Sequence, residues 1–94
     1  MLLAMPQGAE RVRPAADGRV AIVTGAGRGI GRAVASTLAA QGFRVMAVSR
    51  TLAELRTLAE ETGVDYLVES VATSEGCERI IAQTRSRLGP IDVL

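Results

Sequence analysis

The residue pattern predicts an α/β protein with a doubly wound parallel sheet, whose helices cover both faces. Two observations support this. Short apolar runs, typical of buried strands, alternate with segments that have helical periodicity, and the connections between them are short. Such alternation forms right-handed crossovers within a parallel sheet. We therefore expect a partial sheet of about four strands in the spatial order 3-2-1-4, with three helices.

An apolar run and a periodic segment define the first strand and the first helix. Residues 19–24 contain Val20-Ala21-Ile22-Val23, and such a continuous run is typical of a strand covered on both faces. A helix is expected over 30–41, with Gly42 as its left-handed stop, and a second strand over 43–48. Helical spacing predicts that the buried face of the first helix consists of Ile30, Ala33, Val34, Thr37 and Leu38.

The second helix is predicted to begin with a capping box, Thr51-Leu52-Ala53-Glu54. In this motif the threonine hydroxyl accepts a hydrogen bond from the glutamate N–H, and the glutamate carboxylate accepts one from the threonine N–H. Gly63 ends this helix. A third strand, a third helix and a fourth strand are expected over 64–70, 74–88 and 91–94. The inner side of the third helix is expected to consist of Cys77, Ile80, Ile81, Thr84 and Leu88.

The segment Thr24-Gly25-Ala26-Gly27-Arg28-Gly29-Ile30-Gly31 joins the first strand to the first helix. The first N–H groups of a helix have no intrahelical partner, and the helix dipole adds partial positive charge, so this end of a helix favours a phosphate group. Glycines permit the tight turn and the close approach of backbone to phosphate. The chain has no lysine, which excludes the other common phosphate loop. A pyrophosphate-binding loop is therefore predicted.

The end of the second strand indicates which dinucleotide is bound. An acidic residue about 20 positions after the glycine fingerprint binds the ribose 2′-hydroxyl of NAD, but Ser49-Arg50-Thr51 stands there. An arginine offers a planar fork to a 2′-phosphate, and Arg28 adds a second cation. NADP is therefore expected in preference to NAD. The other arginines are expected to be solvated or in weak ion pairs: Arg32, Arg44, Arg56, Arg79, Arg85 and Arg87.

The spacing T-G-x-x-x-G-x-G and the run Val45-Met46-Ala47-Val48-Ser49-Arg50-Thr51 resemble the short-chain dehydrogenase/reductase family, especially its NADPH-dependent carbonyl and xylulose reductases. The resemblance covers residues 19–94. It implies a Rossmann-like domain of an oxidoreductase that moves a hydride between NADP(H) and a small carbonyl or alcohol substrate. It also implies that these residues contact the cofactor: Thr24, Gly25, Arg28, Gly29, Ile30, Gly31, Ser49, Arg50, Thr51, Ser70 and Val71.

The sequence departs from the family pattern in two ways. Where the family commonly has an aspartate that binds the adenine amino group, this chain has Ser70 followed by Val71, and a serine oxygen can accept one bond. The family's catalytic serine and Tyr-x-x-x-Lys pair are absent, since the chain has no lysine and its only tyrosine, Tyr66, lies in an expected strand. The 94-residue chain is therefore predicted to be inactive alone. A nucleotide-binding module without catalysis and a non-functional fragment are the alternatives.

Composition excludes several classes of function. The formal net charge is +1, the arginines are scattered, and only one Phe and one Tyr are available for base stacking, so no nucleic-acid partner is expected. No run approaches the ~20 apolar residues of a membrane span. Without histidine, and with Cys77 as the only cysteine, no metal site is expected.

The domain organisation is expected to be simple. We expect a flexible leader over 1–18 without a signal peptide, a cytoplasmic location, and a nucleotide-binding domain over 19–94 that is truncated in its fourth strand. Homo-oligomers are expected only for the full-length enzyme.

Overall fold

A four-stranded parallel sheet forms the centre of the computed structural model, which describes residues 18–94. Apart from Gly18, the expected leader lies outside the described residues. The strands are β1 (Val20–Thr24), β2 (Arg44–Ser49), β3 (Asp65–Val68) and β4 (Ile91–Val93). The helices are α1 (Gly29–Ala40), α2 (Leu52–Thr62) and α3 (Ser74–Leu88). The sheet order is β3-β2-β1-β4, as the sequence predicts.

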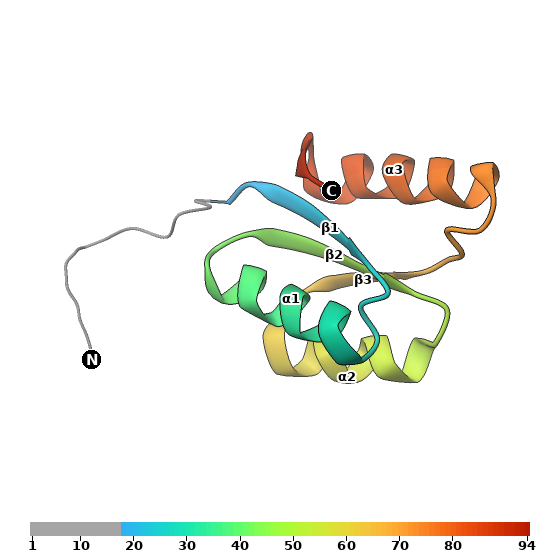
Figure 1. Ribbon diagram of the computed structural model, residues 1–94. Helices are drawn as coiled ribbons and strands as arrows, with labels where there is room; N and C mark the ends of the chain where they lie inside the picture. The colour runs from blue at the N-terminus through green and yellow to red at the C-terminus, as the bar shows by residue number, and fades with distance from the viewer. Residues whose placement is uncertain (1–17) are drawn as a thin grey trace, which may run out of the picture.

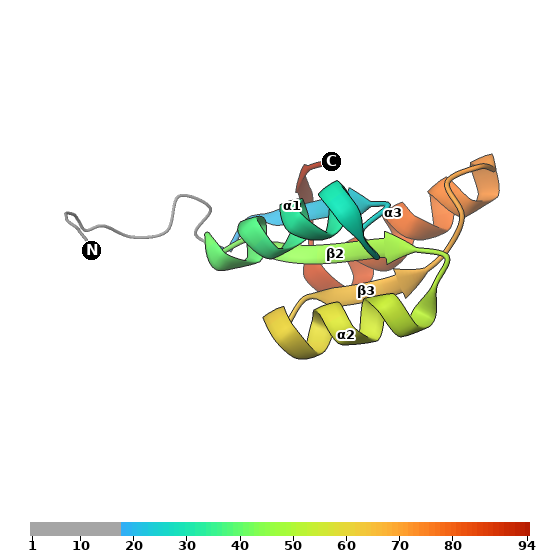
Figure 2. The ribbon, with the colours of Figure 1, turned by 60° about the horizontal axis from the view of Figure 1, so that its bottom comes forward.

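The helices cover the sheet on two sides: α1 and α2 lie on one face and α3 on the other (Figures 1 and 2). Alternate residues of each central strand therefore enter two separate cores. In β2, Val45 and Ala47 pack with Leu55 and Leu58 of α2, whereas Met46 and Val48 belong to the core beneath α3. Burial on both faces explains why this strand is continuously apolar. The doubly wound α/β architecture is confirmed.

The expected glycine ends the second helix, and a threonine cap that the sequence analysis did not name begins the third. Gly63 follows α2 in the left-handed region, with φ of 79°. At the start of α3, the hydroxyl of Thr73 accepts a hydrogen bond from the Gly76 N–H at 3.0 Å, which satisfies one donor of the first turn. These local features account for the agreement of both helix boundaries with the sequence pattern.

The buried face expected for α1 is confirmed for Leu38 but wrong for Ile30, Ala33, Val34 and Thr37, which are exposed. Ala35 is fully buried and Leu38 is half-buried against the core, whereas Ile30 is 84% exposed and Val34 is 42% exposed. The helix is rotated so that Ala35 and Leu38 face the core shared by β1, β2 and α2. The face that carries Ile30 and Val34 points away from the sheet, and none of the described elements covers it.

The inner side of α3 is narrower than expected. Ile80, Thr84 and Leu88 are buried, but Cys77 is exposed and Ile81 is 40% exposed. Spacings of four residues keep the three buried side chains on one line along the helix, and Cys77 and Ile81 lie beside that line. None of the described helices is both long enough and apolar enough to cross a membrane.

Candidate functional site

The expected strand-to-helix turn is present between β1 and α1. Gly25 and Gly29 both have φ of 64°, a conformation that side-chain-bearing residues rarely adopt. The Ala26 N–H donates to the Val48 carbonyl at 3.0 Å, which fixes the turn to the neighbouring strand. Gly31, in the first turn of α1, lies directly against the Gly25 carbonyl, so that a side chain at 31 would overlap the backbone. Glycine at 25, 29 and 31 is therefore required by the turn itself.

The amino end of α1 has no side-chain cap. Arg28 occupies the N-cap position without a side-chain hydrogen bond to the helix, and the first turn carries no acidic residue. The first backbone N–H groups of α1 are therefore left to solvent or to a ligand. Together with the helix dipole, they form a site that favours an anion.

A cleft of about 410 Å³ opens beside this turn, where the carboxyl ends of β1, β2 and β3 meet. In an open parallel sheet, ligands bind at this edge. Seven of the residues expected to contact the cofactor line the cleft: Gly25, Arg28, Ser49, Arg50, Thr51, Ser70 and Val71. The structure thus brings together residues that are up to 46 positions apart in the sequence, Gly25 and Val71.

Four expected contact residues do not line this cleft. Thr24 is the exposed last residue of β1, and Gly29 and Ile30 are exposed at the start of α1. Gly31 packs against the turn. These residues border the free helix end rather than the cleft, so a ligand that contacts both groups must extend from one to the other.

The predicted capping box does not form. No side-chain hydrogen bond caps α2, and the Thr51 N–H donates instead to the Ser49 hydroxyl at 3.0 Å. The Glu54 carboxylate points toward the cleft, where Oε2 lies 4.0 Å from Nε of Arg28. The Ser49 oxygen satisfies the donor that the motif assigns to Glu54. Glu54 is therefore a cleft residue that the sequence interpretation assigned to helix capping.

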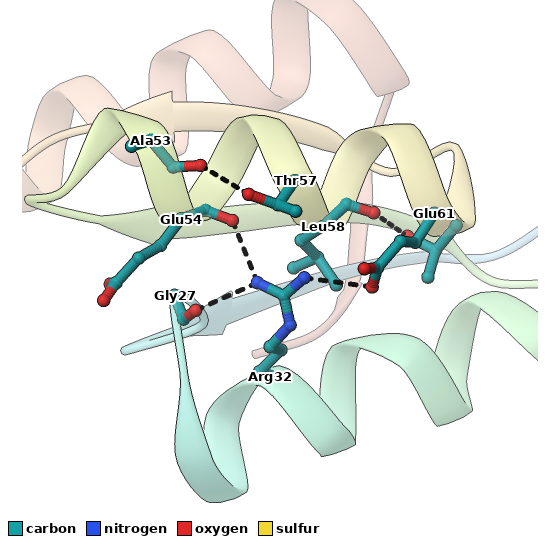
Figure 3. Close-up of polar contacts among 8 residues, drawn as sticks. Gly27, Arg32, Ala53, Glu54, Thr57, Leu58 and Glu61 are labelled. Carbon is teal, nitrogen blue, oxygen red and sulfur yellow. Dashed lines mark hydrogen bonds and ion pairs between the residues drawn. The ribbon is translucent and has the colours of Figure 1, made fainter.

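Arg32 fixes the glycine turn to α2 (Figure 3). Its Nη1 donates to the Gly27 carbonyl at 3.1 Å and to the Glu54 carbonyl at 3.0 Å, and its Nη2 pairs with Glu61 at 3.0 Å. The side chain is only 25% exposed. The expectation of a solvated or weakly paired arginine is wrong here, because the guanidinium donates to backbone carbonyls of two separate segments as well as to Glu61.

The loop after β3 forms the far wall of the cleft. Val71 is 54% exposed there, and the Ser70 hydroxyl oxygen already accepts a bond from the Ala72 N–H at 3.0 Å. Glu69, which the sequence interpretation missed, also lines this wall. It forms a bidentate pair with Arg79 of α3, with N···O distances of 2.8 and 2.9 Å. Glu69 directly follows β3 and stands five residues before α3 begins, a position that gives no sequence signal for such a pair.

The Glu69 pair has an effect that depends on pH. The hydrogen bonds from Arg79 and from the Ser70 N–H lower the pKa of Glu69 from 4.5 to about 2, and the same pair raises the pKa of Arg79. Because the pKa is lower in the folded state, Glu69 contributes stability above about pH 4.5, and this contribution is lost as the pH falls toward about 2.

We therefore predict that the difference in unfolding free energy between the wild-type chain and Glu69→Gln narrows as the pH falls through this interval. Replacing Arg79 with methionine is expected to return the pKa of Glu69 toward its ordinary value, since the principal hydrogen bond is removed. Carboxyl-carbon NMR titration measures this pKa directly. Titration of Glu69 at its ordinary pKa in the wild-type chain would contradict the prediction.

Two other expectations concern chemistry outside the cleft. Within residues 18–94, no three acidic, cysteine or histidine side chains lie close enough together to hold a metal ion. Tyr66 is half-buried in β3 against the core shared with α1 and α2, and does not line the cleft. It is therefore a structural residue of the sheet.

Comparison with known proteins identifies the family. The family model for short chain dehydrogenases matches residues 19–94. Bovine L-xylulose reductase is 46% identical over 78 residues, which are 82% of this chain and 30% of that protein. The chain thus spans about 30% of the length of this relative.

Two solved structures share the fold. A metagenomic short-chain oxidoreductase in complex with NADP has a TM-score of 0.78 at 31% identity, covering 83% of this chain and 38% of the other. L-Sorbose reductase from Gluconobacter frateurii, complexed with NADPH and L-sorbose, has a TM-score of 0.68 at 36% identity, covering 82% and 32%. These matches confirm the resemblance in the sequence, and the chain belongs to the short-chain dehydrogenase family.

Proposed function

We propose that this chain is the NADP(H)-binding part of an oxidoreductase that transfers a hydride between NADP(H) and a carbonyl or alcohol substrate. The observation that carries the proposal is the position of Arg50, which lines the same cleft as the glycine turn. A cation at this place favours a nucleotide with a third phosphate. Bound NADPH supplies the hydride, and the residues of this chain bind and orient the nucleotide.

The residues at the turn fit a pyrophosphate. The N–H groups at the start of α1 have no side-chain partner, and Gly25, Gly29 and Gly31 let a ligand approach the backbone there. An anionic group there gains charge-assisted hydrogen bonds from the backbone. We assign the two bridging phosphates of the dinucleotide to this position.

The residues at the end of β2 fit a 2′-phosphate. Arg50 is exposed at the cleft and forms no ion pair with the other residues of the described range 18–94, so its guanidinium is available to a ligand. Ser49 and Thr51 add hydroxyl groups on either side. Guanidinium groups bind phosphate through two parallel hydrogen bonds, which gives both affinity and orientation.

The far wall fits the adenine ring. Val71 offers an exposed apolar side chain, and Ser70 retains a hydroxyl proton and one lone pair after its bond to the Ala72 N–H. Two similar solved proteins are described with NADP or NADPH bound. This supports the phosphorylated nucleotide for the present chain as well.

Nucleotide titration of the 94-residue chain tests the proposal. NADPH is expected to bind with enhanced nicotinamide fluorescence. At a 100-fold excess over its Kd, bound NADPH is expected to add about 2.7 kcal/mol to the free energy of unfolding and so to raise the melting temperature. NADH, which lacks only the 2′-phosphate, is the matched control and is expected to bind more weakly. Equal or stronger binding of NADH, or no stabilisation by either nucleotide, would contradict the proposal.

A further inference from the structure

The Glu54 carboxylate shares a corner of the cleft with the groups assigned to the 2′-phosphate. A methyl group placed on Gly27 would overlap Oε1 of Glu54 and would lie 2.9 Å from the Ser49 hydroxyl oxygen, so both oxygens lie over the same glycine. Arg28, on the other side of the carboxylate, is 4.0 Å away. A negative side chain therefore lies among the polar groups that a phosphate would contact.

The main chain of Glu54 is fixed, but its side chain is held weakly. Arg32 binds the Glu54 carbonyl at 3.0 Å and the Gly27 carbonyl at 3.1 Å, and Figure 3 shows the Glu54 side chain extending away from Arg32. The carboxylate has only Arg28 as an ion-pair partner in the described range, at the limit of ion-pair distance, and the Arg28 side chain is 88% exposed. Exposed pairs of this kind contribute little.

Glu69 provides the contrast within the same cleft. Its carboxylate receives two hydrogen bonds from Arg79, at 2.8 and 2.9 Å, and one from the Ser70 N–H at 3.2 Å. Its charge is thus compensated and its position is fixed. Of the two carboxylates that line the cleft, Glu54 is the one whose charge acts on a ligand and whose side chain is able to move.

We infer that Glu54 is a specificity-determining residue, an internal anion that a 2′-phosphate must displace from beside Arg28. The inference rests on the proposed nucleotide function. A carboxylate repels a phosphate dianion but accepts a hydrogen bond from a ribose 2′-hydroxyl. Glu54 thus lowers the preference for the phosphorylated nucleotide that Arg50 and Arg28 create, and it leaves the site able to bind the unphosphorylated one.

The test compares wild type with Glu54→Gln, which keeps the size and the main-chain contacts of the side chain and removes its charge. The measurement is the Kd of NADPH and of NADH for the 94-residue chain, by nicotinamide fluorescence. Glu54→Gln removes the repulsion of the 2′-phosphate and is expected to tighten NADPH binding. The expected gain is only about fivefold, because the charge lies at a partly exposed site. NADH binding is expected to stay unchanged or to weaken, since the amide oxygen accepts a hydrogen bond less strongly than a carboxylate.

Glu60→Gln is the matched control, because Glu60 is an exposed carboxylate on the same helix that does not line the cleft. It removes the same charge and is expected to change neither Kd. Glu54→Ala is expected to repeat the gain in NADPH affinity without an amide group. If Glu54 had only a structural role, its replacement would change the Kd of NADPH and the Kd of NADH by similar factors.

The outcomes separate the two proposals. The inference about Glu54 would be overturned if Glu54→Gln changed both Kd values equally, or if it left NADPH binding unchanged or weaker. In each of these cases, binding of NADPH by the wild-type chain would still uphold the proposed function. Failure of the wild-type chain to bind either nucleotide would overturn both.

Discussion

Alanine at position 31 is expected to destabilise the chain and to abolish NADPH binding. The added methyl group would lie 2.7 Å from the Gly25 carbonyl carbon and overlap its oxygen. Neither partner can retreat easily, since Gly25 is fixed in the left-handed region and the next residue is hydrogen-bonded to β2. Overpacking of this kind costs about 1–3 kcal/mol, and each kcal/mol lowers the melting temperature of a domain this small by roughly 4–8 °C.

Gly27→Ala is the matched control for stability. The atoms nearest to a methyl group at position 27 belong to side chains, the Glu54 carboxylate, the Ser49 hydroxyl and, at 3.2 Å, the Glu54 Cβ, so smaller shifts suffice than at Gly31 and a smaller loss of stability is expected. Thermal melting of the two variants measures the difference. A Gly31→Ala chain with the melting temperature and NADPH affinity of wild type would show that the turn does not pack as described.

Arg50→Ala is expected to weaken NADPH binding by about 10- to 100-fold. Hydrogen bonds to charged groups contribute roughly 1.5–3 kcal/mol, and each 1.4 kcal/mol corresponds to tenfold in Kd. NADH affinity is expected to change far less, because NADH has no 2′-phosphate for the guanidinium to bind. Parallel fluorescence titrations with the two nucleotides measure the loss of preference.

Two further variants separate a specific contact from a general effect of charge. Arg56→Ala removes an exposed cation of α2 that does not line the cleft, and it is expected to leave both affinities near wild type. Arg50→Lys keeps the charge but loses the planar fork, so only part of the affinity is expected to remain. If Arg50→Ala weakens NADPH and NADH equally, Arg50 does not contact the 2′-phosphate.

The sheet was predictable from the alternation of strands and helices along the chain, and the helix boundaries from local chemistry. The alternating pattern of the chain gave the strand order 3-2-1-4, and α3 begins and ends at the expected residues, Ser74 and Leu88. Glycine stops act over three or four residues, so they are visible in sequence. The buried faces were predicted less well. On α1, a stripe of apolar residues fits helical spacing equally well when it faces solvent, and Ile30 does so.

The candidate site divides in the same way. The sequence alone was enough to locate the glycine turn and Ser49-Arg50-Thr51, since each follows the end of a strand, and parallel strands end at one edge of the sheet. Their direct contact with a nucleotide stays a prediction.

The roles of Arg32, Glu54 and Glu69 depended on the folded chain, because each bond joins separate elements: Arg32 joins α1 to α2, and Glu69 joins the end of β3 to α3. Glu54 stands three residues after Thr51 whether its carboxylate caps α2 or lines the cleft. The competing acceptor, here the Ser49 hydroxyl oxygen that already binds the Thr51 N–H, decides between these roles only after folding.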